Sequence, residues 1–544
     1  MVPTLTGHIT SAEWRWLLLV AGGIVLLAFV PFLWVLLAGV AGTSWHFMGA
    51  LHGYGDGALH LALVTQGADS GWLTRLLFTP EPNSGTLMGV FYALLGQITS
   101  ITALTPIVIF HVARLGAAVT MLLALYHLAA NIWMRIRTRR LFFVFSLLGG
   151  GFGWLLAPLA GSEAYLDLNA PQAFPFYGML VNVHIPLAIT CLAISAGVIV
   201  SVFRPNNGSA PNVNNGGLIV FLMGLALVFV YPLALAPLAL AFVLRVLVHA
   251  AQHGGFAYAK VQWLLWFIVP ALPVAVYYAM VMRYDPIVRA AWMQTTTSAP
   301  SPLVMVLSFG LPLLIALPGL WRAVRRFEPD GDQFMLLWLL VIVLFVYLPG
   351  GFHQSFLLGI TIPLMYFATR SIEDFWLDHI SRRWRLRLMV ALIPVMAASF
   401  LLVLMLPARA VTSDSRSAGM LLPRDYADAF SYLRQRIREN DVVLAAPNVS
   451  LWLPAWTGAQ VVYGHPNEAV EPMRKRDAVV AWYRHTNPDD CQALLDGDLA
   501  YHEPYRVDYV IYGPEEARIG ETVCLDELNL LRRFGDVAVY AAGR

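Results

Sequence analysis

The chain contains a series of long apolar runs with almost no charged residue inside them, and these runs restrict its fold more than any other feature. An α-helix needs about 20 apolar residues to cross the hydrocarbon core of a membrane, which is about 30 Å thick. A chain with many such runs is predicted to be a polytopic α-helical membrane protein. The runs that reach or approach the required length are 16–39, 106–130, 141–160, 183–203, 262–282, 303–320 and 388–407.

Other apolar segments raise the expected number of spans. Segments 334–348 and 356–371 are shorter. Segment 218–246 is too long for one crossing, but it carries Tyr231-Pro232 near its middle, where proline would break a helix. We therefore predict about eleven transmembrane helices. The composition agrees, because 58% of the 544 residues are hydrophobic and only 12% are charged, about half the charge of a soluble domain.

The arginines predict the orientation of the spans, because cytoplasmic loops carry an excess of Lys and Arg. One set of loops is rich in arginine, whereas the alternate loops hold only Arg75, Arg283 and Arg289. We therefore expect the N-terminus in the cytoplasm. The segments then expected outside are 40–105, 161–182, 283–302, 349–355 and the tail from residue 408.

The first outer loop, 40–105, has about 65 residues, and loops of that length are usually functional. Its segment 86–104 is apolar, but a span there would invert every later loop and destroy the arginine pattern. We therefore predict a helix at 86–104 that lies on or dips into the outer leaflet. Residues 205–217 are predicted to form a flexible polar linker on the cytoplasmic side.

The C-terminal part of the chain is predicted to be a soluble domain, because the charge density rises after Val411. We place the boundary between a membrane domain, 1–410, and an extracytoplasmic domain, 411–544. Alternating helix and strand patterns predict a small three-layer α/β unit, and Cys491 and Cys524 are expected to pair outside the cell. The helices are expected at Asp425–Asn440, 471–484 and 526–533, and the strands at Val442–Ala446, Val461–Gly464, Val507–Tyr512 and Val537–Ala541.

A carboxylate and a histidine near the start of the first outer loop are the main catalytic candidates. Asp56 and His60 are four residues apart and would share one face of a helix. A carboxylate at the groove between a surface helix and a helical bundle is suited to act as a general base for a hydroxyl. The alternative interpretation is that Asp56 caps a helix over 57–66. We expect a catalytic Asp56 at the mouth of a cavity that also holds a cation.

Several polar side chains near the predicted membrane spans are candidates for binding a substrate. An arginine inside a span, such as Arg114, is costly unless it has a partner, and a phosphate group is a natural one. The alternatives are an internal ion pair for Arg114, an interfacial anchor for Arg283 and Arg289, and a helix cap for the His353-Gln354 pair. The candidate substrate-binding residues are His60, Arg75, Arg114, Arg283, Arg289, His353 and Gln354.

The second outer loop carries acidic residues and no cation. Its Glu163 and Asp167 could hold a divalent cation together with Asp56. The alternative is a solvated acidic loop, because the sequence has no dense carboxylate cluster there. Binding to nucleic acid is not expected, since the chain has no basic tract.

Taken together, the layout resembles the GT-C superfamily of membrane glycosyltransferases. Members have a cytoplasmic N-terminus, a long first outer loop with a functional acidic residue, many further spans and often an outer C-terminal domain. The stretch Asp56-Gly-Ala-Leu-His60 looks like the start of the first surface helix in that superfamily, although Gly55 stands where many members have a second acid. The chain also resembles a set of uncharacterised bacterial membrane proteins in Phe78-Thr-Pro-Glu-Pro82, His111-Val-Ala-Arg114-Leu, Tyr463-Gly-His-Pro466 and Tyr512-Gly-Pro514.

This resemblance implies a reaction at the outer face of a bacterial cytoplasmic membrane. A sugar would pass from a polyprenyl-phosphate-linked donor to a lipid, glycan or protein acceptor, with inversion at the anomeric carbon. Asp56 would be the general base, and Arg114, Arg283 or Arg289 would stabilise the departing phosphate. Two alternatives remain open at this stage: a lipid or solute transporter, and a non-catalytic assembly protein that retains the GT-C fold.

Overall fold

The computed structural model describes residues 9–542 except 41–43, 205–212, 294–297, 330, 413–418, 486–490, 500 and 502–503. Residues 205–212 of the expected linker at 205–217 lie outside the described residues. The chain divides into two compact units. The first comprises Met1–Pro31, Arg114–Tyr277 and Thr297–Leu406, and the second comprises Phe32–Ala113, Tyr278–Thr296 and Pro407–Arg544.

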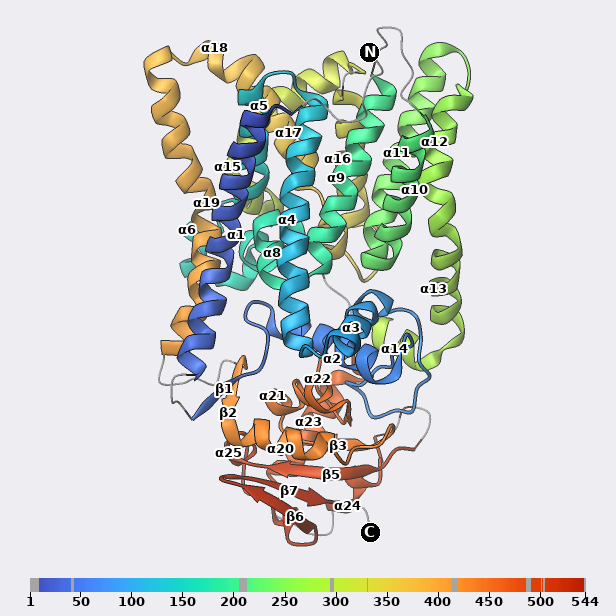
Figure 1. Cartoon of the computed structure of the whole chain (residues 1–544), viewed down its shortest axis with the longest axis vertical. Coiled ribbons are helices and arrows are strands. Elements are labelled where there is room, and N and C mark those ends of the chain that lie inside the picture. Colours follow the sequence, from blue (N-terminus) through green and yellow to red (C-terminus); the bar gives the residue numbers. More distant parts are fainter. Residues whose placement is uncertain are drawn as a thin grey trace. The chain divides into compact units, whose positions relative to one another are not determined.

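The first unit is a bundle of apolar helices (Figure 1). Among the described residues of the whole chain, eight helical segments are long and apolar enough to cross a membrane, and α10 and α16 are shorter apolar helices. Every run predicted to cross the membrane forms helix over most of its length, with interruptions at 149–152 and before Thr361. The chain is a multi-pass membrane protein. The main helices built from these runs are α1 (Ser11–Val40), α4 (Pro106–Ile132), α5 (Ile136–Leu148), α6 (Gly153–Ala160), α9 (His184–Phe203), α10 (Val213–Val230), α11 (Pro232–His253), α12 (Tyr258–Ile268), α13 (Leu272–Tyr284), α15 (Pro302–Arg326), α16 (Asp332–Tyr347), α17 (Thr361–Ser371) and α19 (Arg382–Thr412).

The expected break in segment 218–246 is confirmed. Helix α10 ends at Val230 and α11 begins at Pro232, with Tyr231 in a non-helical conformation between them. Proline is favourable at the first position of a helix because it has no amide hydrogen to leave unbonded there. The one long apolar segment therefore forms two shorter helices.

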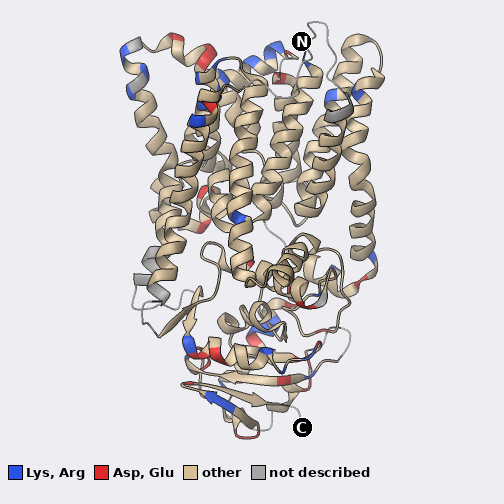
Figure 2. Ribbon diagram, in the orientation of Figure 1, with Lys and Arg blue, Asp and Glu red and all other residues tan. Residues whose placement is uncertain are grey.

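Charged residues are distributed unevenly along the first unit. Figure 2 shows most of its Lys and Arg residues at one end of the helices, the end at which α1 begins. This arrangement follows from the arginine-rich set of loops, and the orientation in the membrane that these arginines indicate stays a prediction.

The first outer loop forms two short helices in the second unit, α2 (Tyr54–Ser70) and α3 (Val90–Thr102). The helix expected at 86–104 is therefore present, and its 13 residues span only about 20 Å, too little to cross the membrane. The two helices pack at glycines: a Cβ atom at Gly67 would lie 2.4 Å from the Ala93 oxygen, and one at Gly96 would lie 2.3 Å from the Val64 oxygen. Larger residues at Gly67 or Gly96 would push the helices apart.

The tail contains a five-stranded sheet in the order β4-β3-β5-β7-β6 (Figure 1). Strands β4, β3 and β5 are parallel, and β7 and β6 continue the sheet antiparallel. Helices α20 and α23 match two of the three predicted helices, although α20 ends at Arg434 rather than near Asn440. The elements are β3 (Val442–Leu444), β4 (Gln460–Val461), β5 (Val507–Tyr512), β6 (Asn529–Phe534), β7 (Val537–Ala541), α20 (Arg424–Arg434) and α23 (Pro472–Tyr483).

The helix predicted at 526–533 is wrong. This segment contains strand β6, which pairs with β7 through a tight turn at Gly535, where φ is 53°. A short segment with apolar and charged residues fits either a helix or a strand, and only its neighbours decide between them. Here the edge of β7 supplies the hydrogen-bonding partners.

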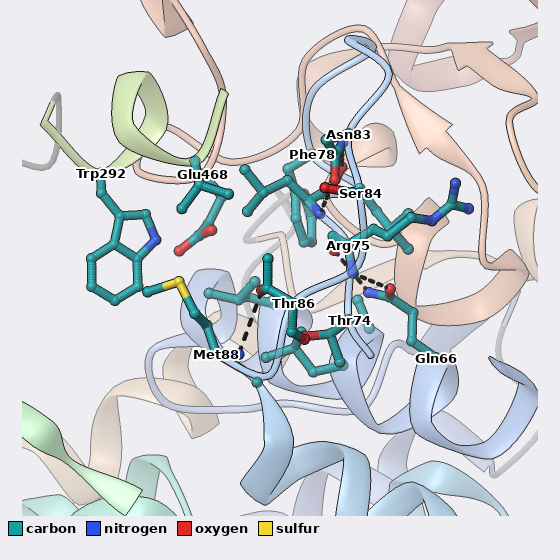
Figure 3. Close-up of a pocket in the computed structure, with 17 residues that line it drawn as sticks. Gln66, Thr74, Arg75, Phe78, Asn83, Ser84, Thr86, Met88, Trp292 and Glu468 are labelled. Carbon is teal, nitrogen blue, oxygen red and sulfur yellow. Dashed lines mark hydrogen bonds between the residues drawn. The ribbon is translucent and has the colours of Figure 1, made fainter. Parts of the chain in front are cut away.

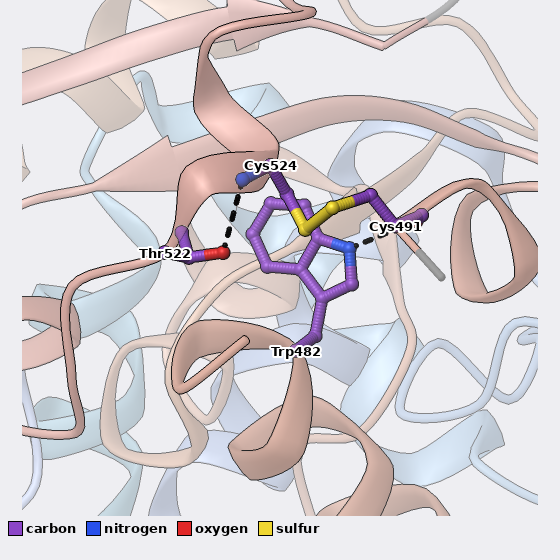
Figure 4. The surroundings of a disulfide bond; sticks show 4 residues. All are labelled: Trp482, Cys491, Thr522 and Cys524. Atoms are coloured by element: carbon purple, nitrogen blue, oxygen red, sulfur yellow. Dashed lines mark hydrogen bonds between the residues drawn. A yellow bond between two sulfur atoms is a disulfide. The ribbon is translucent and has the colours of Figure 1, made fainter. Parts of the chain in front are cut away.

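The predicted disulfide between Cys491 and Cys524 is confirmed, with Cα atoms 5.4 Å apart. Figure 4 shows Trp482 beside the bond, where its Nε1–H donates to the Cys491 carbonyl oxygen at 3.1 Å. Both cysteines are buried. The bond closes the part of the tail between α23 and the β6–β7 hairpin.

The second unit joins distant parts of the sequence. Strand β1 (Trp45–Phe47), at the start of the first outer loop, pairs with β2 (Leu421–Pro423), at the start of the tail. Helix α14 (Pro286–Met293) belongs to the same unit. The compact unit therefore includes the first outer loop as well as the tail, whereas the sequence predicted one boundary near residue 410.

Candidate active site

Asp56 lies within the first turn of α2. The helix begins at Tyr54 and is preceded by Gly53, whose φ of 54° is left-handed, so Asp56 is not the residue that precedes the helix, as the capping interpretation requires. A carboxylate in this turn is stabilised by the helix dipole. The next residue must be small, because a Cβ atom at Gly57 would lie 2.3 Å from the Cβ of Ala50. The Asp56 side chain is 52% exposed.

A histidine from the tail faces this carboxylate. The Nε2 atom of His465 lies 3.6 Å from Oδ1 of Asp56, and its side chain is only 4% exposed. The Nδ1 atom accepts a hydrogen bond from the Asn467 amide at 3.2 Å, so the proton of the neutral ring is on Nε2 and is directed at Asp56. A Cβ atom at Gly55 would lie 3.6 Å from the same Nε2. His465 therefore lies beside Gly55 as well as beside Asp56.

Glu468 adds a second carboxyl group near Asp56 and His465. The pKa of Glu468 is raised to about 7, mainly by burial; the charge of His465 acts to lower it and the negative charge of Asp56 acts to raise it. Figure 3 shows the carboxyl group on the side of a cleft that carries Trp292 and Met88. These apolar neighbours are a poor environment for a charge, which agrees with the raised pKa of Glu468.

A buried ion pair fixes the segment that carries His465 and Glu468. Lys475 and Glu81 form this pair, and both side chains are fully buried. The hydroxyl of Thr79 accepts hydrogen bonds from Lys475 Nζ at 3.1 Å and from the Val470 amide at 3.2 Å. The motif Phe78-Thr-Pro-Glu-Pro82 therefore connects the first outer loop to the tail, close to the 465–468 turn.

A narrow cleft of about 90 Å³ begins one helical turn after Asp56. Leu59, Leu63 and Gln66 of α2 line it on the face that continues from Asp56, and Trp292 of α14 and Glu468 line another side (Figure 3). This volume holds a few water molecules but not a sugar, since ligand sites usually measure about 300–1,000 Å³. The cleft can hydrate Glu468, and a saccharide would have to contact the exposed side of Asp56.

The other predicted residues of the second unit have different environments. Arg75 lines the cleft, but its guanidinium is bonded to Asn440 at 2.7 Å and to Glu439, and Figure 3 shows it directed away from Glu468. His60 stacks on Tyr92 with ring centroids 4.3 Å apart. Arg283 and Arg289 have no ion-pair partner among the described residues, and Arg289 is adjacent to Val288, which lines the cleft.

The remaining candidates for substrate binding belong to the first unit. Arg114 is buried, donates to the Leu180 carbonyl oxygen and lies over the ring of Phe29 at 4.8 Å. The Nδ1 atom of His353 is hydrogen-bonded to the Val346 oxygen at 2.7 Å. The carbonyl oxygen of the next residue, Gln354, accepts from Gln172 at 3.3 Å. Their participation in the Asp56 site stays a prediction.

The two candidate metal ligands are in unlike environments. Asp167 is fully buried and accepts hydrogen bonds from the Gly151 amide at 3.2 Å, the Gly153 amide at 3.0 Å and the Ser399 hydroxyl at 2.5 Å. Glu163 is exposed. Within the part of the chain that the structure describes, no group of three or more His, Cys, Asp or Glu side chains could hold a metal ion.

Sequence reasoning missed His465 and Glu468 as members of this site. Both follow the buried strand β4, and His465 belongs to the segment Tyr463-Gly-His-Pro466, which we had noted only for its resemblance to other proteins. Polar residues after a buried strand often carry function. That pattern could have marked them as candidates, but it could not have paired them with Asp56.

Comparison with known proteins identifies the fold. No protein-family model and no curated protein match the chain. The solved structure of ArnT from Cupriavidus metallidurans bound to undecaprenyl phosphate is similar over 98% of both chains, with 13% identity and a TM-score of 0.55, and its apo state gives the same values. The archaeal oligosaccharyltransferase AglB from Archaeoglobus fulgidus, in complex with an inhibitory peptide and a dolichol-phosphate, is 12% identical over 93% of this chain and 70% of its own, with a TM-score of 0.49.

The ArnT similarity defines the fold. The chain is a multi-pass α-helical membrane protein whose fold is similar to that of ArnT, with a small C-terminal α/β domain. At 13% identity the similarity extends to the fold, and the activity is argued below from this chain's own residues.

Proposed function

We propose that this protein transfers a sugar from a polyprenyl-phosphate-linked donor to a hydroxyl acceptor at the outer face of a bacterial cytoplasmic membrane. The GT-C fold supports this proposal, and ArnT, which shares it, has been solved bound to undecaprenyl phosphate. The observation that carries the proposal is the contact between Asp56 and His465, 3.6 Å apart. It combines an exposed carboxylate with a fixed N–H group in the second unit.

Asp56 is the general base in this reaction. Its carboxylate takes the proton of the acceptor hydroxyl as the oxygen attacks the anomeric carbon of the donor. The new bond forms on the face opposite the phosphate, the bond between the anomeric carbon and the phosphate oxygen breaks, and the configuration inverts. Polyprenyl phosphate leaves with the bonding electrons.

His465 is a positioning residue in this mechanism. Its Nε2–H faces Oδ1 of Asp56 and orients the carboxylate, and the Asn467 amide at Nδ1 keeps the ring in that tautomer. The carboxyl groups of Asp56 and Glu468 interact through their charges. When Asp56 takes a proton, it no longer raises the pKa of Glu468, so Glu468 can release its own proton to the water of the cleft.

The leaving phosphate gains negative charge and needs a cation. Arg283 and Arg289 are candidates in the second unit, and Arg114 and His353 are candidates in the first. Lipid, glycan and protein acceptors all remain compatible with this site, because each can present a hydroxyl. The orientation of the protein, with the tail outside, is supported by the gathering of Lys and Arg at one end of the first unit (Figure 2).

The test is transfer by the purified protein in nanodiscs. A panel of labelled polyprenyl-phosphate sugars serves as donors, and membranes of the source organism supply the acceptor. We expect release of polyprenyl phosphate, and a loss of about 100-fold or more in Asp56→Asn. Asp69→Asn is the matched control, because Asp69 is in the same loop but forms an exposed ion pair with Arg434.

The result also separates the alternatives. A transporter would move the donor across the bilayer without releasing polyprenyl phosphate. A non-catalytic assembly protein would give equal, background release with wild type and Asp56→Asn. Full activity in a folded Asp56→Asn variant would contradict the assigned base.

A further inference from the structure

The tail contains a second cleft at the carboxyl ends of its parallel strands. Strand β3 lies between β4 and β5, so the chain leaves β3 toward one neighbour and later returns on its other side. Ligands of open α/β sheets bind outside the strand ends at such a switch point. The cleft is formed there, by residues that follow β3 and residues that follow β5.

This cleft measures about 670 Å³ and is lined by three arginines. Arg476 and Arg484 are on or directly after α23, with Val480 between them, so they form one stripe along the helix. Arg518 faces the cleft from the segment after β5. Glu515 is the one acidic residue in the lining, so the charges sum to an excess of positive charge.

The arginines retain donors for a ligand. The Nε–H of Arg484 donates to the Ile519 carbonyl oxygen at 3.1 Å, which fixes the orientation of its guanidinium without using the terminal amino groups. Arg518 pairs with Glu515. Arg476 is exposed and has no ion-pair partner within the described segments. A planar guanidinium matches the oxygens of a phosphate group, to which it can donate two parallel hydrogen bonds.

The protein's own carboxylate occupies the backbone amides beneath this cleft. Glu516 is fully buried and accepts from the Ala446 amide at 2.8 Å and from the Gly513 amide at 2.9 Å. These amides follow β3 and β5. A ligand anion therefore cannot bind them, and the exposed arginine side chains remain as the anion-binding groups.

We propose that this cleft binds an organic phosphate, with Arg476, Arg484 and Arg518 as its ligand-binding residues. The volume lies within the range of small-molecule sites, about 300–1,000 Å³, so it holds a phosphate group together with the saccharide or headgroup that carries it. The site is separate from Asp56 and does not depend on the proposed transfer reaction. Its ligand is either a soluble sugar phosphate or a phosphorylated headgroup at the end of a lipid.

The test is calorimetric titration of the full-length protein. Glucose 6-phosphate is the soluble probe, glucose is the neutral control, and nanodiscs with and without phosphatidic acid present a phosphate on a lipid. We expect a phosphate-bearing probe to bind, and the double substitution Arg476→Gln and Arg484→Gln to weaken binding by about tenfold or more. Arg436→Gln is the matched control, because Arg436 lies over Tyr432 and does not line the cleft.

The outcomes are distinct. Binding of glucose 6-phosphate identifies a soluble source, and binding only to phosphatidic acid nanodiscs identifies a lipid source. Failure of both probes, equal binding of glucose, or unchanged affinity in the folded double variant would overturn the proposal. Binding of the phosphate probe should persist in Asp56→Asn. The phosphate-binding proposal therefore does not fail if the transferase proposal fails.

Discussion

The buried ring of His465 points its Nε2 atom at Oδ1 of Asp56, 3.6 Å away. One residue comes from the tail and the other from the first outer loop, so the candidate site requires both segments. The amide of Asn467 donates to Nδ1, so Nε2 is the ring nitrogen whose proton faces the carboxylate.

Replacing His465 tests that contact. We expect His465→Ala to lower the transfer rate by about tenfold or more, because outer partners of a reactive group typically contribute that much. His465→Gln should recover part of the rate, since its side-chain amide can donate to Asp56. The measurement is single-turnover transfer, with the melting temperature recorded to verify folding. Equal rates for His465→Ala and His465→Gln would argue against the proposal that an N–H group at this position orients Asp56.

Two carboxyl groups with raised pKa values, Glu468 and Glu516, predict a pH-dependent stability of the second unit. Burial raises the pKa of both Glu468 and Glu516 to about 7 in the folded protein. An acid with a raised pKa contributes stability below its unfolded pKa, and this contribution is lost as the pH rises through the folded value. Stability should therefore fall between about pH 5 and pH 8.

The matched substitutions separate the two contributions. Glu468→Gln and Glu516→Gln should each flatten the dependence of the melting temperature on pH, and the double variant should flatten it most. Asp69→Asn, at an exposed position, should leave the slope unchanged. A wild-type melting temperature that rises over this range would contradict the raised pKa values.

The ion pair of Glu81 and Lys475 is fully buried. Removing one of the two charges should therefore be poorly tolerated, and removing both together should be tolerated better. Glu81→Gln or Lys475→Met leaves one buried charge without its partner and should destabilise the second unit by about 3–5 kcal/mol. The double substitution should cost less than the sum of the two. Limited proteolysis of the tail and denaturant titration measure this, and strict additivity would show that the residues act independently.

The disulfide should stabilise the tail against unfolding. Its cysteines are 33 residues apart, a separation for which loop closure predicts about 3–4 kcal/mol. Replacing Cys491 and Cys524 with Ser together should lower the stability of the tail, and a reductant should do the same to the wild type. Cys191→Ser should not reproduce the effect, because Cys191 is a free cysteine. The readout is protease resistance of the tail with and without reductant.

Single cysteines test the orientation in the membrane. In a background without free cysteine, Ser162→Cys should react with an impermeant thiol reagent added outside intact cells, and Gly255→Cys should react only after permeabilisation. Both positions are exposed, and a Cβ atom at Gly255 meets no atom within 4 Å. The reverse labelling pattern would place the tail in the cytoplasm.

The membrane helices were predictable because each depends on a local property, the length of an apolar run. The break at Tyr231 was predictable for the same reason, since proline acts on its own helix. Strand β6 was not predictable, because its conformation depends on pairing with β7. The pairing of Asp56 with His465 depends on contacts between distant segments, which local patterns do not encode.

The position of Asp56, after the first span and at the start of a helical pattern, marked it as a catalytic candidate, and its role stays a prediction. Its surroundings differ from the expectation in one respect. The cleft that begins one helical turn after Asp56 measures about 90 Å³, and the predicted cation that lines it, Arg75, is bonded to Asn440 and Glu439. The side chains that approach Asp56 are instead a histidine and a second acid.

The pairing of β1 with β2 has a consequence for biosynthesis. Residues 45–47 leave the ribosome early, but their partners at 421–423 are made only after every membrane span has been synthesised. During this interval the first outer loop lacks the strand that pairs with it. Glu81 also lacks its ion-pair partner Lys475, and Asp56 lacks its neighbour His465. A truncated or stalled chain would therefore display an incompletely folded loop, and exposed unfolded segments of this kind are bound by chaperones and cut by proteases.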